Sequence, residues 1–291
     1  MLVSRCFWQF VLLCAVIVTS PVFASSSSPG VQEWLLRLHG SNTVGGELAP
    51  TLAEAYLRKL GASHITNVMS EIENERIVSG QLGSDRVGIF IAAHGSSTGF
   101  KAMLTGEADI AMASRAIKDK EVDQLAHFGP MRGFAHEHVI GLDGIAIIVH
   151  PSNPITTLDK GQLALVFSGV ITNWQQLGGA DQPIKLHARD DRSGTWDTFN
   201  HLVLAKRPLG NAKRYESNAG LAQAVSEDRN GIGFVGLATT GNNRVLAISD
   251  DETRPLLPKP RLVATEDYPL ARRLFMYSNN DPGNRYEEDF L

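Results

Sequence analysis

Short apolar runs alternate with segments of helical periodicity along most of this chain. Runs with the length and composition of buried strands cover residues 89–93, 110–113, 145–149, 184–186, 232–237 and 274–277. Between them lie segments with a helical repeat, such as the one that places Leu48, Leu52 and Leu60 on one face. This alternation predicts an α/β fold, in which helices pack against a sheet.

The N-terminus has the pattern of a secretory signal peptide. Residues 1–24 carry one charge, Arg5, ahead of an apolar run at residues 10–18, and they end on a small residue, Ala24. The apolar run is too short to span a bilayer, and no later stretch approaches the ~20 apolar residues that a transmembrane helix needs. We therefore expect cleavage near Ala24, a periplasmic or secreted protein, and a flexible tether at residues 25–30.

The composition argues against several kinds of site. Both cysteines, Cys6 and Cys14, lie within the expected signal peptide, so the exported chain has no thiol for a disulfide, a zinc site or a nucleophile. His136 and His138 lack the i, i+4 spacing that places two imidazoles on one helix face. With 27 basic and 31 acidic residues, the chain has no excess of positive charge for nucleic acid. We expect no metal, no cofactor and no nucleic acid.

Three junctions between a strand-like run and a helical segment share small hydroxyl residues and glycine. They cover residues 40–43, 95–99 and 193–195. The start of a helix leaves backbone N–H groups unpaired and carries a partial positive charge, so it suits an anion. Serine and threonine are also common N-caps, and one junction alone would support only that interpretation. The three junctions, with Arg189 four residues before Ser193, suggest one shared anion site.

Two motifs offer rival interpretations. Residues 95–99 match the G-x-S-x-G nucleophile elbow, which would make Ser97 the nucleophile of a serine hydrolase with His187 or His201 as its base. No oxyanion-loop motif precedes this match, so a hydrolase is the distant alternative. Residues 231–236 match G-x-G-x-x-G, but their apolar positions indicate a strand and no convincing helix follows. A dinucleotide site is therefore not expected.

Several short motifs follow one another in a specific order. They are G-S-N-T-V at 40–44, G-S-S-T-G at 95–99, A-D-I-A-M-A-S-R at 108–115, D-G-I-A at 143–146, F-S-G at 167–169, N-W at 173–174, L-G-G at 177–179, R-D-D-R-S-G-T at 189–195, G-I-G-F-V-G at 231–236 and Y-P-L at 268–270. In this order and spacing the chain resembles the substrate-binding protein of the ABC phosphate transporter. The similarity runs through nearly the whole exported chain.

The resemblance implies a two-lobe periplasmic-binding-protein fold, type II-like, with the ligand in a cleft between the lobes. Lobe one would comprise residues 31–142 and 239–291, and lobe two residues 143–238. The protein would capture inorganic phosphate without catalysis, act as a monomer, and deliver the anion to a membrane ABC permease. The alternatives are another oxyanion, such as sulfate, molybdate or phosphonate, or a role in phosphate sensing or adhesion. Relatives continue past residue 291, so we expect a C-terminal truncation.

Matched by position, the resemblance also implies which residues form the site. Those expected to hold phosphate oxygens are Thr43, the backbone of Val44 and Ser96 from lobe one, and Arg189, Ser193, Gly194 and Thr195 from lobe two. Asp191 would brace the arginine. Ser41 and Ser97 would support the first two junctions.

One position departs from the family pattern. Well-known phosphate binders have an aspartate after the Ala-Ser of the second strand, where it accepts the proton of bound phosphate, whereas this chain has Arg115. Relatives with Ser-Arg at this point carry an acid in the segment that here contains Asp143. Asp143 is thus the candidate acceptor, with Arg115 pairing with it or with the anion. Because Asp-Gly also marks turns, a turn residue at the crossover between lobes is the other interpretation.

Overall fold

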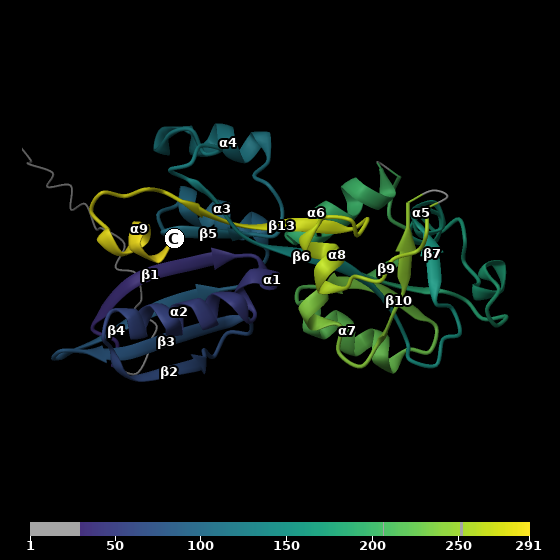
Figure 1. Ribbon diagram of the computed structural model, residues 1–291, viewed down its shortest axis with the longest axis horizontal. Coiled ribbons are helices and arrows are strands. Elements are labelled where there is room, and N and C mark those ends of the chain that lie inside the picture. The colour runs from purple at the N-terminus through teal and green to yellow at the C-terminus, as the bar shows by residue number, and fades with distance from the viewer. Residues whose placement is uncertain (1–29, 206, 251–252) are drawn as a thin grey trace, which may run out of the picture.

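A computed structural model of the protein describes residues 30–205, 207–250 and 253–291, so the expected signal peptide lies outside the described residues. Helices and strands alternate along the chain (Figure 1), which confirms the predicted α/β class. The strands are β1 (Glu33–Gly40), β2 (Ser63–Met69), β3 (Glu75–Leu82), β4 (Asp85–Ala92), β5 (Ile110–Ala113), β6 (Glu137–Val149), β7 (Thr157–Asp159), β8 (Lys185–Arg189), β9 (Ala212–Tyr215), β10 (Gly231–Gly236), β11 (Arg244–Val245), β12 (Ala247–Ser249) and β13 (Ala271–Ser278). The helices are α1 (Asn42–Gly45), α2 (Leu48–Lys59), α3 (Ser96–Leu104), α4 (Asp119–Leu125), α5 (Lys160–Phe167), α6 (Gly194–Phe199), α7 (Asn218–Glu227), α8 (Pro260–Ala264) and α9 (Arg285–Phe290).

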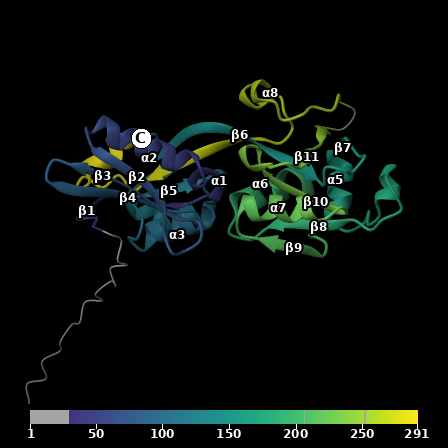
Figure 2. The ribbon, with the colours of Figure 1, turned by 90° about the horizontal axis from the view of Figure 1, so that it is seen from below.

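One hydrogen-bonded path joins most of the strands, in the order β2-β3-β4-β1-β5-β13-β6-β10-β8-β9, with β11 also paired to β6. The path divides along β6. Residues 137–144 of β6 pair with β13, whereas residues 145–149 pair with β10. Figures 1 and 2 show the consequence: the molecule forms two lobes, and β6 and β13 run between them.

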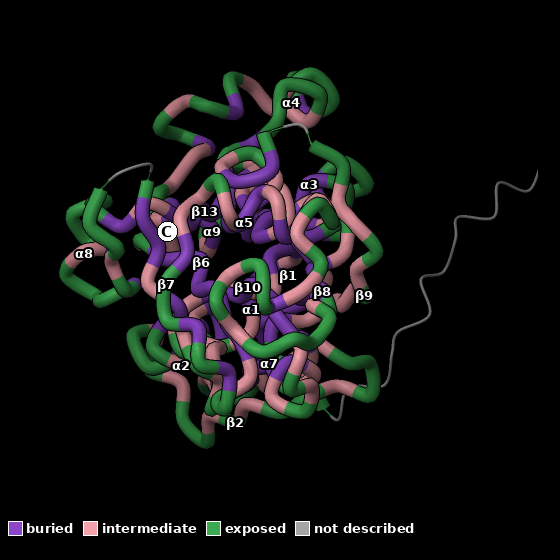
Figure 3. The backbone as a smooth tube through the Cα atoms, turned by 90° about the vertical axis from the view of Figure 1, so that its right-hand side faces the viewer, coloured by how far each residue is buried: buried purple, intermediate pink, exposed green. Residues whose placement is uncertain are grey.

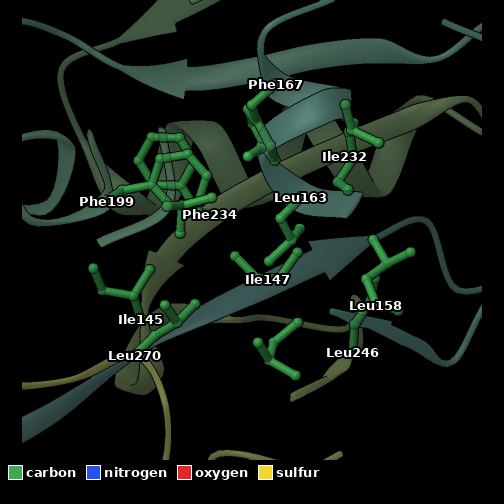
Figure 4. Close-up of a cluster of buried hydrophobic side chains, with 14 of the residues drawn as sticks. Ile145, Ile147, Leu158, Leu163, Phe167, Phe199, Ile232, Phe234, Leu246 and Leu270 are labelled. Atoms are coloured by element: carbon green, nitrogen blue, oxygen red, sulfur yellow. The ribbon is translucent and has the colours of Figure 1, made fainter. Parts of the chain in front are cut away.

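Each lobe has its own apolar core, and Figure 3 shows buried residues towards the middle of the molecule with exposed residues around them. In the first lobe, Leu36 and Ile89 of the sheet are buried against Leu57 of α2. In the second lobe, the rings of Phe199 and Phe234 stack with their centroids 4.0 Å apart (Figure 4). Two separate cores make each lobe a unit that can keep its shape while the crossing strands bend.

Residues 244–250 and 253–270 pack with the second lobe. Their apolar side chains, Leu246 and Val263 among them, are buried in the same cluster as Ile145. The chain returns to the first lobe only at β13, so the return predicted at residue 239 is too early. The described residues of this segment contain only the short strands β11 and β12 and the five-residue helix α8, and their periodicity therefore gives little sign of where they pack. In the structure, lobe one is residues 31–142 and 271–291, and lobe two is residues 143–270.

Candidate functional site

The first junction turns sharply at the end of β1. Gly40 has a φ of +133°, and a Cβ there would lie 2.2 Å from the carbonyl oxygen of Met112, so the turn requires glycine. Ser41 then caps α1, with its Oγ accepting from the backbone N–H of Val44 at 3.4 Å. This turn places the Oγ1 of Thr43 within 3.2 Å of the Oγ1 of Thr195 in lobe two.

The second and third junctions meet across the lobes. Ser96 begins α3, and its Oγ accepts from the backbone N–H of Ser114 at 3.1 Å. Ser193 caps α6 with its side chain. Gly194, the next residue, lies so close to lobe one that a Cβ on it would be 2.2 Å from the Oγ of Ser96. Ser96, Ser193 and Thr195 are all buried, so the three predicted junctions come together in one place.

Arg189 ends β8 and is only 1% exposed. Its guanidinium donates to three uncharged oxygens: the carbonyls of Tyr215, at 3.3 Å from Nε, and Glu216, and the side-chain oxygen of Asn218. Within the described part of the chain, none of the salt bridges involves Arg189. Burial lowers the pKa of Arg189 to about 10, which leaves it charged at neutral pH. The cluster therefore contains a buried cation that forms no salt bridge with a carboxylate among the described residues.

The expected brace for Arg189 is not found. The side chain of Asp191 is 85% exposed and pairs with Arg214. The neighbouring acid, Asp190, pairs with Arg192 at 2.8 Å. Both acids lie in the turn after β8, beyond the buried end of the strand, so the prediction for Asp191 is wrong.

Arg115 has partners other than the predicted ones. Its guanidinium is buried and pairs with Glu121 at 2.6 Å and with Asp197 at 2.7 Å, and it also donates to the Oγ of Ser97 at 3.1 Å. Asp197 belongs to α6 of lobe two. Arg115 therefore links the two lobes. Of its two expected partners, Asp143 and the anion, Asp143 is not paired with it, because Glu121 and Asp197 take its place.

Asp143 pairs with Arg272, a residue that the sequence analysis missed. The two residues are register partners on β6 and β13, the strands that cross between the lobes. Nε and Nη2 of Arg272 donate to Oδ2 of Asp143 at 2.9 and 2.6 Å, and Oδ1 accepts from the backbone N–H of Leu237 at 3.1 Å. Arg272 also donates to the Oγ1 of Thr195 at 2.9 Å and to that of Thr43 at 3.2 Å. The interpretation of Asp143 as a simple turn residue is thereby excluded.

Asn218 is the second residue that the sequence analysis missed. It begins α7, and its Nδ2 donates to the Oγ1 of Thr43 at 3.1 Å. Ser217 and Asn218 precede a helical segment, as do the polar residues of the other three junctions, so this signal was present in the sequence. Arg272 gave no such signal, because only the register of β13 separates this buried arginine from the exposed Arg273.

A further ion cluster links the lobes through His94. Its Nδ1 lies 2.6 Å from Glu216 of lobe two and its Nε2 lies 3.1 Å from Glu75 on β3, while Glu216 also accepts from Arg192 at 2.8 Å. Burial alone would lower the pKa of His94, but the hydrogen bonds to the two carboxylates outweigh it and raise the pKa. His39, on β1, has its pKa lowered to about 4, mainly by burial, and stays neutral.

The surroundings of Ser97 do not form a hydrolase triad. In the described residues its hydroxyl has Arg115 as its side-chain partner and no histidine. The ring of His187, one of the two candidate bases, instead bonds through Nδ1 to the hydroxyl of Tyr215 at 2.9 Å.

Sequence comparison finds a matching family model and several relatives. A family model described as a PBP superfamily domain matches residues 54–290. The phosphate-binding protein PstS of Pseudomonas aeruginosa is 32% identical over 226 residues, covering 70% of this chain and 68% of that protein. The protein SphX of Synechococcus elongatus is 31% identical over 210 residues, covering 68% of this chain. That match spans 61% of SphX, less than two thirds of its length.

Solved structures share the fold. A putative phosphate ABC transporter substrate-binding protein from Clostridium perfringens, solved with bound phosphate, is 27% identical, covers 88% of this chain and 91% of its own, and superposes with a TM-score of 0.67. An ABC-type phosphate transport receptor from Vibrio cholerae is 24% identical, covers 88% of this chain and 91% of its own, and has a TM-score of 0.61, which supports the fold alone.

Among the described residues, none of the helices combines the length and apolar character needed to cross a membrane. No group of three or more histidine, cysteine, aspartate or glutamate side chains in this part of the chain could hold a metal ion.

Replacing Gly194 with alanine should prevent the lobes from closing. The new Cβ would lie 2.2 Å from the Oγ of Ser96 and 2.7 Å from that of Ser114, and both serines belong to the other lobe. Because the clash lies between lobes, we expect an unfolding temperature close to that of the wild type. Small-angle scattering in saturating phosphate should show compaction for the wild type and none for Gly194→Ala.

Gly141→Ala is the matched control, because a Cβ on Gly141, in β6, would meet no atom within 4 Å. It should compact as the wild type does. Equal compaction of Gly194→Ala would show that the contact between Gly194 and Ser96 is not required for closure.

The His94 cluster should make stability depend on pH. The pKa of His94 in the folded protein is raised above its ordinary value of 6.5. The contribution of His94 to the free energy of unfolding is therefore fully present below pH 6.5 and is lost as pH rises through the folded pKa. We expect the free energy of unfolding of wild type to exceed that of His94→Gln most at about pH 6, and the gap to shrink towards about pH 8.5. Denaturant titrations at several pH values measure this gap.

His127→Gln serves as the control for a surface histidine, because His127 is exposed. The difference in the free energy of unfolding between wild type and His127→Gln should not shrink in this way as pH rises. A gap for His94→Gln that grows with pH would contradict the assigned partners, Glu216 and Glu75.

Proposed function

This chain belongs to the PBP superfamily, among the phosphate-binding proteins of ABC transporters, and from this premise we propose that it captures inorganic phosphate between its lobes. It acts as a binding protein and not as an enzyme. Export in its mature form, a monomeric state and delivery of phosphate to a membrane permease belong to the same proposal.

The observation that carries the proposal is an excess of buried positive charge. Arg189 is 1% exposed, Arg272 6% and Asp143 8%. Two guanidinium groups and one carboxylate leave one positive charge without a partner in this cluster. Removing a charge from water without a partner costs several kcal/mol, and an anion held between the lobes would offset that cost. The mutual repulsion of Arg189 and Arg272, which contributes to the lowered pKa of Arg189, favours the same ligand.

The hydrogen-bonding groups around this charge suit a tetrahedral oxyanion. A buried oxyanion is stable only if each of its oxygens accepts from donors, and charged donors contribute most. We assign phosphate contacts to Thr43, Ser96, Ser193 and Thr195 through their hydroxyls, to Val44 and Gly194 through their backbone N–H groups, and to Arg189. Asp143, which pairs with Arg272, is the acceptor for the proton of the ligand.

The relatives support phosphate over other oxyanions. The Pseudomonas aeruginosa relative is named a phosphate-binding protein, and the Clostridium perfringens structure contains phosphate. Sulfate, molybdate and phosphonate would meet the same donors, so a titration with all four anions tests the assignment. If any of the other three anions binds more tightly than phosphate, that anion is the ligand of the site.

Arg189→Gln should weaken phosphate binding far more than Arg192→Gln. Arg189 is buried without a carboxylate partner, whereas Arg192 is exposed and already paired with Asp190 and Glu216. Arg189→Gln should reduce the free energy of phosphate binding by about 2–5 kcal/mol, the range for truncating one member of a buried charged pair. Isothermal titration calorimetry with phosphate measures both variants, and equal losses would overturn the site assignment.

Asp143→Asn should shift selectivity towards sulfate. Sulfate has no proton for a carboxylate to accept at neutral pH, so Asp143 and sulfate would place two anionic oxygens in contact inside a closed cleft. Replacing the carboxylate by an amide removes this repulsion and raises the net charge of the buried cluster from one positive charge to two. We expect the ratio of sulfate to phosphate affinity to rise at least about tenfold, the discrimination that an unpaired buried polar group supports.

Competition titrations of the two anions against wild type and variant decide this point. If wild type already binds sulfate as tightly as phosphate, or if the variant leaves the ratio unchanged, Asp143 serves only to pair with Arg272.

A further inference from the structure

The hydroxyl of Thr43 is surrounded by hydrogen-bond donors. Its oxygen accepts from Nδ2 of Asn218 at 3.1 Å and from Nη2 of Arg272 at 3.2 Å. A hydroxyl has two lone pairs and one proton. Because both lone pairs are occupied, the Thr43 hydroxyl can form a further hydrogen bond only as a donor. The Oγ1 of Thr195 lies within reach of that proton, at 3.2 Å, so a ligand oxygen placed against both hydroxyls would compete with Thr195 for it.

Neither neighbour can reverse its role. A guanidinium has no acceptor, so Arg272 always donates. The amide of Asn218 is oriented by its other end, since its Oδ1 accepts from Arg189 and, at 3.4 Å, from the backbone N–H of Gly236. The NH₂ group must therefore face Thr43.

Arg272 uses all of its N–H groups within the protein. Nε and one hydrogen of Nη2 go to Asp143, and the other hydrogen of Nη2 goes to Thr43. Nη1 donates to the Oγ1 of Thr195 at 2.9 Å and to the carbonyl of Ser114 at 3.5 Å. No donor remains for a ligand, so the effect of Arg272 on a bound anion passes through the two threonine hydroxyls and through its charge.

We propose that Arg272 is a positioning residue of the anion site: together with Asn218 it holds the Thr43 hydroxyl as a donor, and it occupies one lone pair of Thr195, so that both hydroxyls are oriented to donate to unprotonated oxygens of the ligand. This inference rests on the proposed binding of phosphate between the lobes. Thr43 belongs to lobe one, Thr195 to lobe two and Arg272 to a crossing strand, so only the closed arrangement brings all three together. Arg272 thereby couples closure to the orientation of the donors.

Arg272→Lys in wild-type and Thr43→Val backgrounds tests this role. Lysine keeps the charge but presents its donors from a single atom, and it cannot hold both hydroxyls and Asp143 in a fixed fork. We expect Arg272→Lys to weaken phosphate binding about 30-fold in the wild-type background and less than about 10-fold when the Thr43 hydroxyl is absent, as coupled neighbours do in a double-mutant cycle. If Arg272 had a purely structural role, Arg272→Lys would weaken phosphate binding by the same factor in both backgrounds.

Arg273→Lys is the matched control, since Arg273 is the next residue of β13 and its exposed side chain pairs with Glu266. It should change phosphate affinity by less than about twofold in either background. Thermal unfolding without phosphate monitors the fold of each variant. If Arg272→Lys does not fold, the uncharged pair Asp143→Asn with Arg272→Gln takes its place, because a neutral replacement of a buried ion pair is often tolerated.

The outcomes separate the two proposals. Equal losses for Arg272→Lys in both backgrounds, with tight binding by wild type, overturn the positioning role and leave the proposed function intact. Failure of wild type to bind phosphate in the same calorimetric titration overturns both.

Discussion

The ion pair between Asp143 and Arg272 connects the two strands that cross between the lobes, and the site is arranged around it. Both side chains are buried and their residues are register partners on β6 and β13. A buried ion pair is stable only when its remaining hydrogen-bonding groups are satisfied. Here the remaining N–H groups of Arg272 reach Thr43 and Thr195. The crossing strands therefore contribute to the proposed site as well as connecting the lobes.

Closure of the lobes balances several charges. Links from His94 to Glu216 and from Arg115 to Asp197 stabilise the closed arrangement, whereas the uncompensated charge at Arg189 destabilises it. An anion that binds the closed form more tightly than the open one would shift the equilibrium towards closure. The chain as a whole is mildly acidic, with a formal net charge of −4. Attraction of an anion therefore depends on these local groups and not on the overall field.

The same pattern explains why a hydroxyl-rich site need not be catalytic. Ser97 lies in a G-x-S-x-G sequence at the start of a helix, the setting of a hydrolase nucleophile. Nucleophilic activation requires a base within hydrogen-bond reach, and the partner of Ser97 is instead the guanidinium of Arg115, which can only donate. Similar local sequences thus serve binding or catalysis according to what the rest of the fold places beside them.

The sequence by itself determined the α/β class, the positions of the strands β4, β5, β6, β8, β10 and β13, and the three helix starts, because periodicity and capping are local properties. It also identified Thr43, Ser96 and Arg189, which lie on or beside those starts. Only the tertiary structure decided the partners of the charged groups: Asp143 pairs with an arginine 129 positions away, and Asp191 turns outwards to Arg214. Those partners depend on strand register and on the contact between lobes. Neither is encoded in a short stretch of sequence, since the residues that meet there are brought together only when the chain folds.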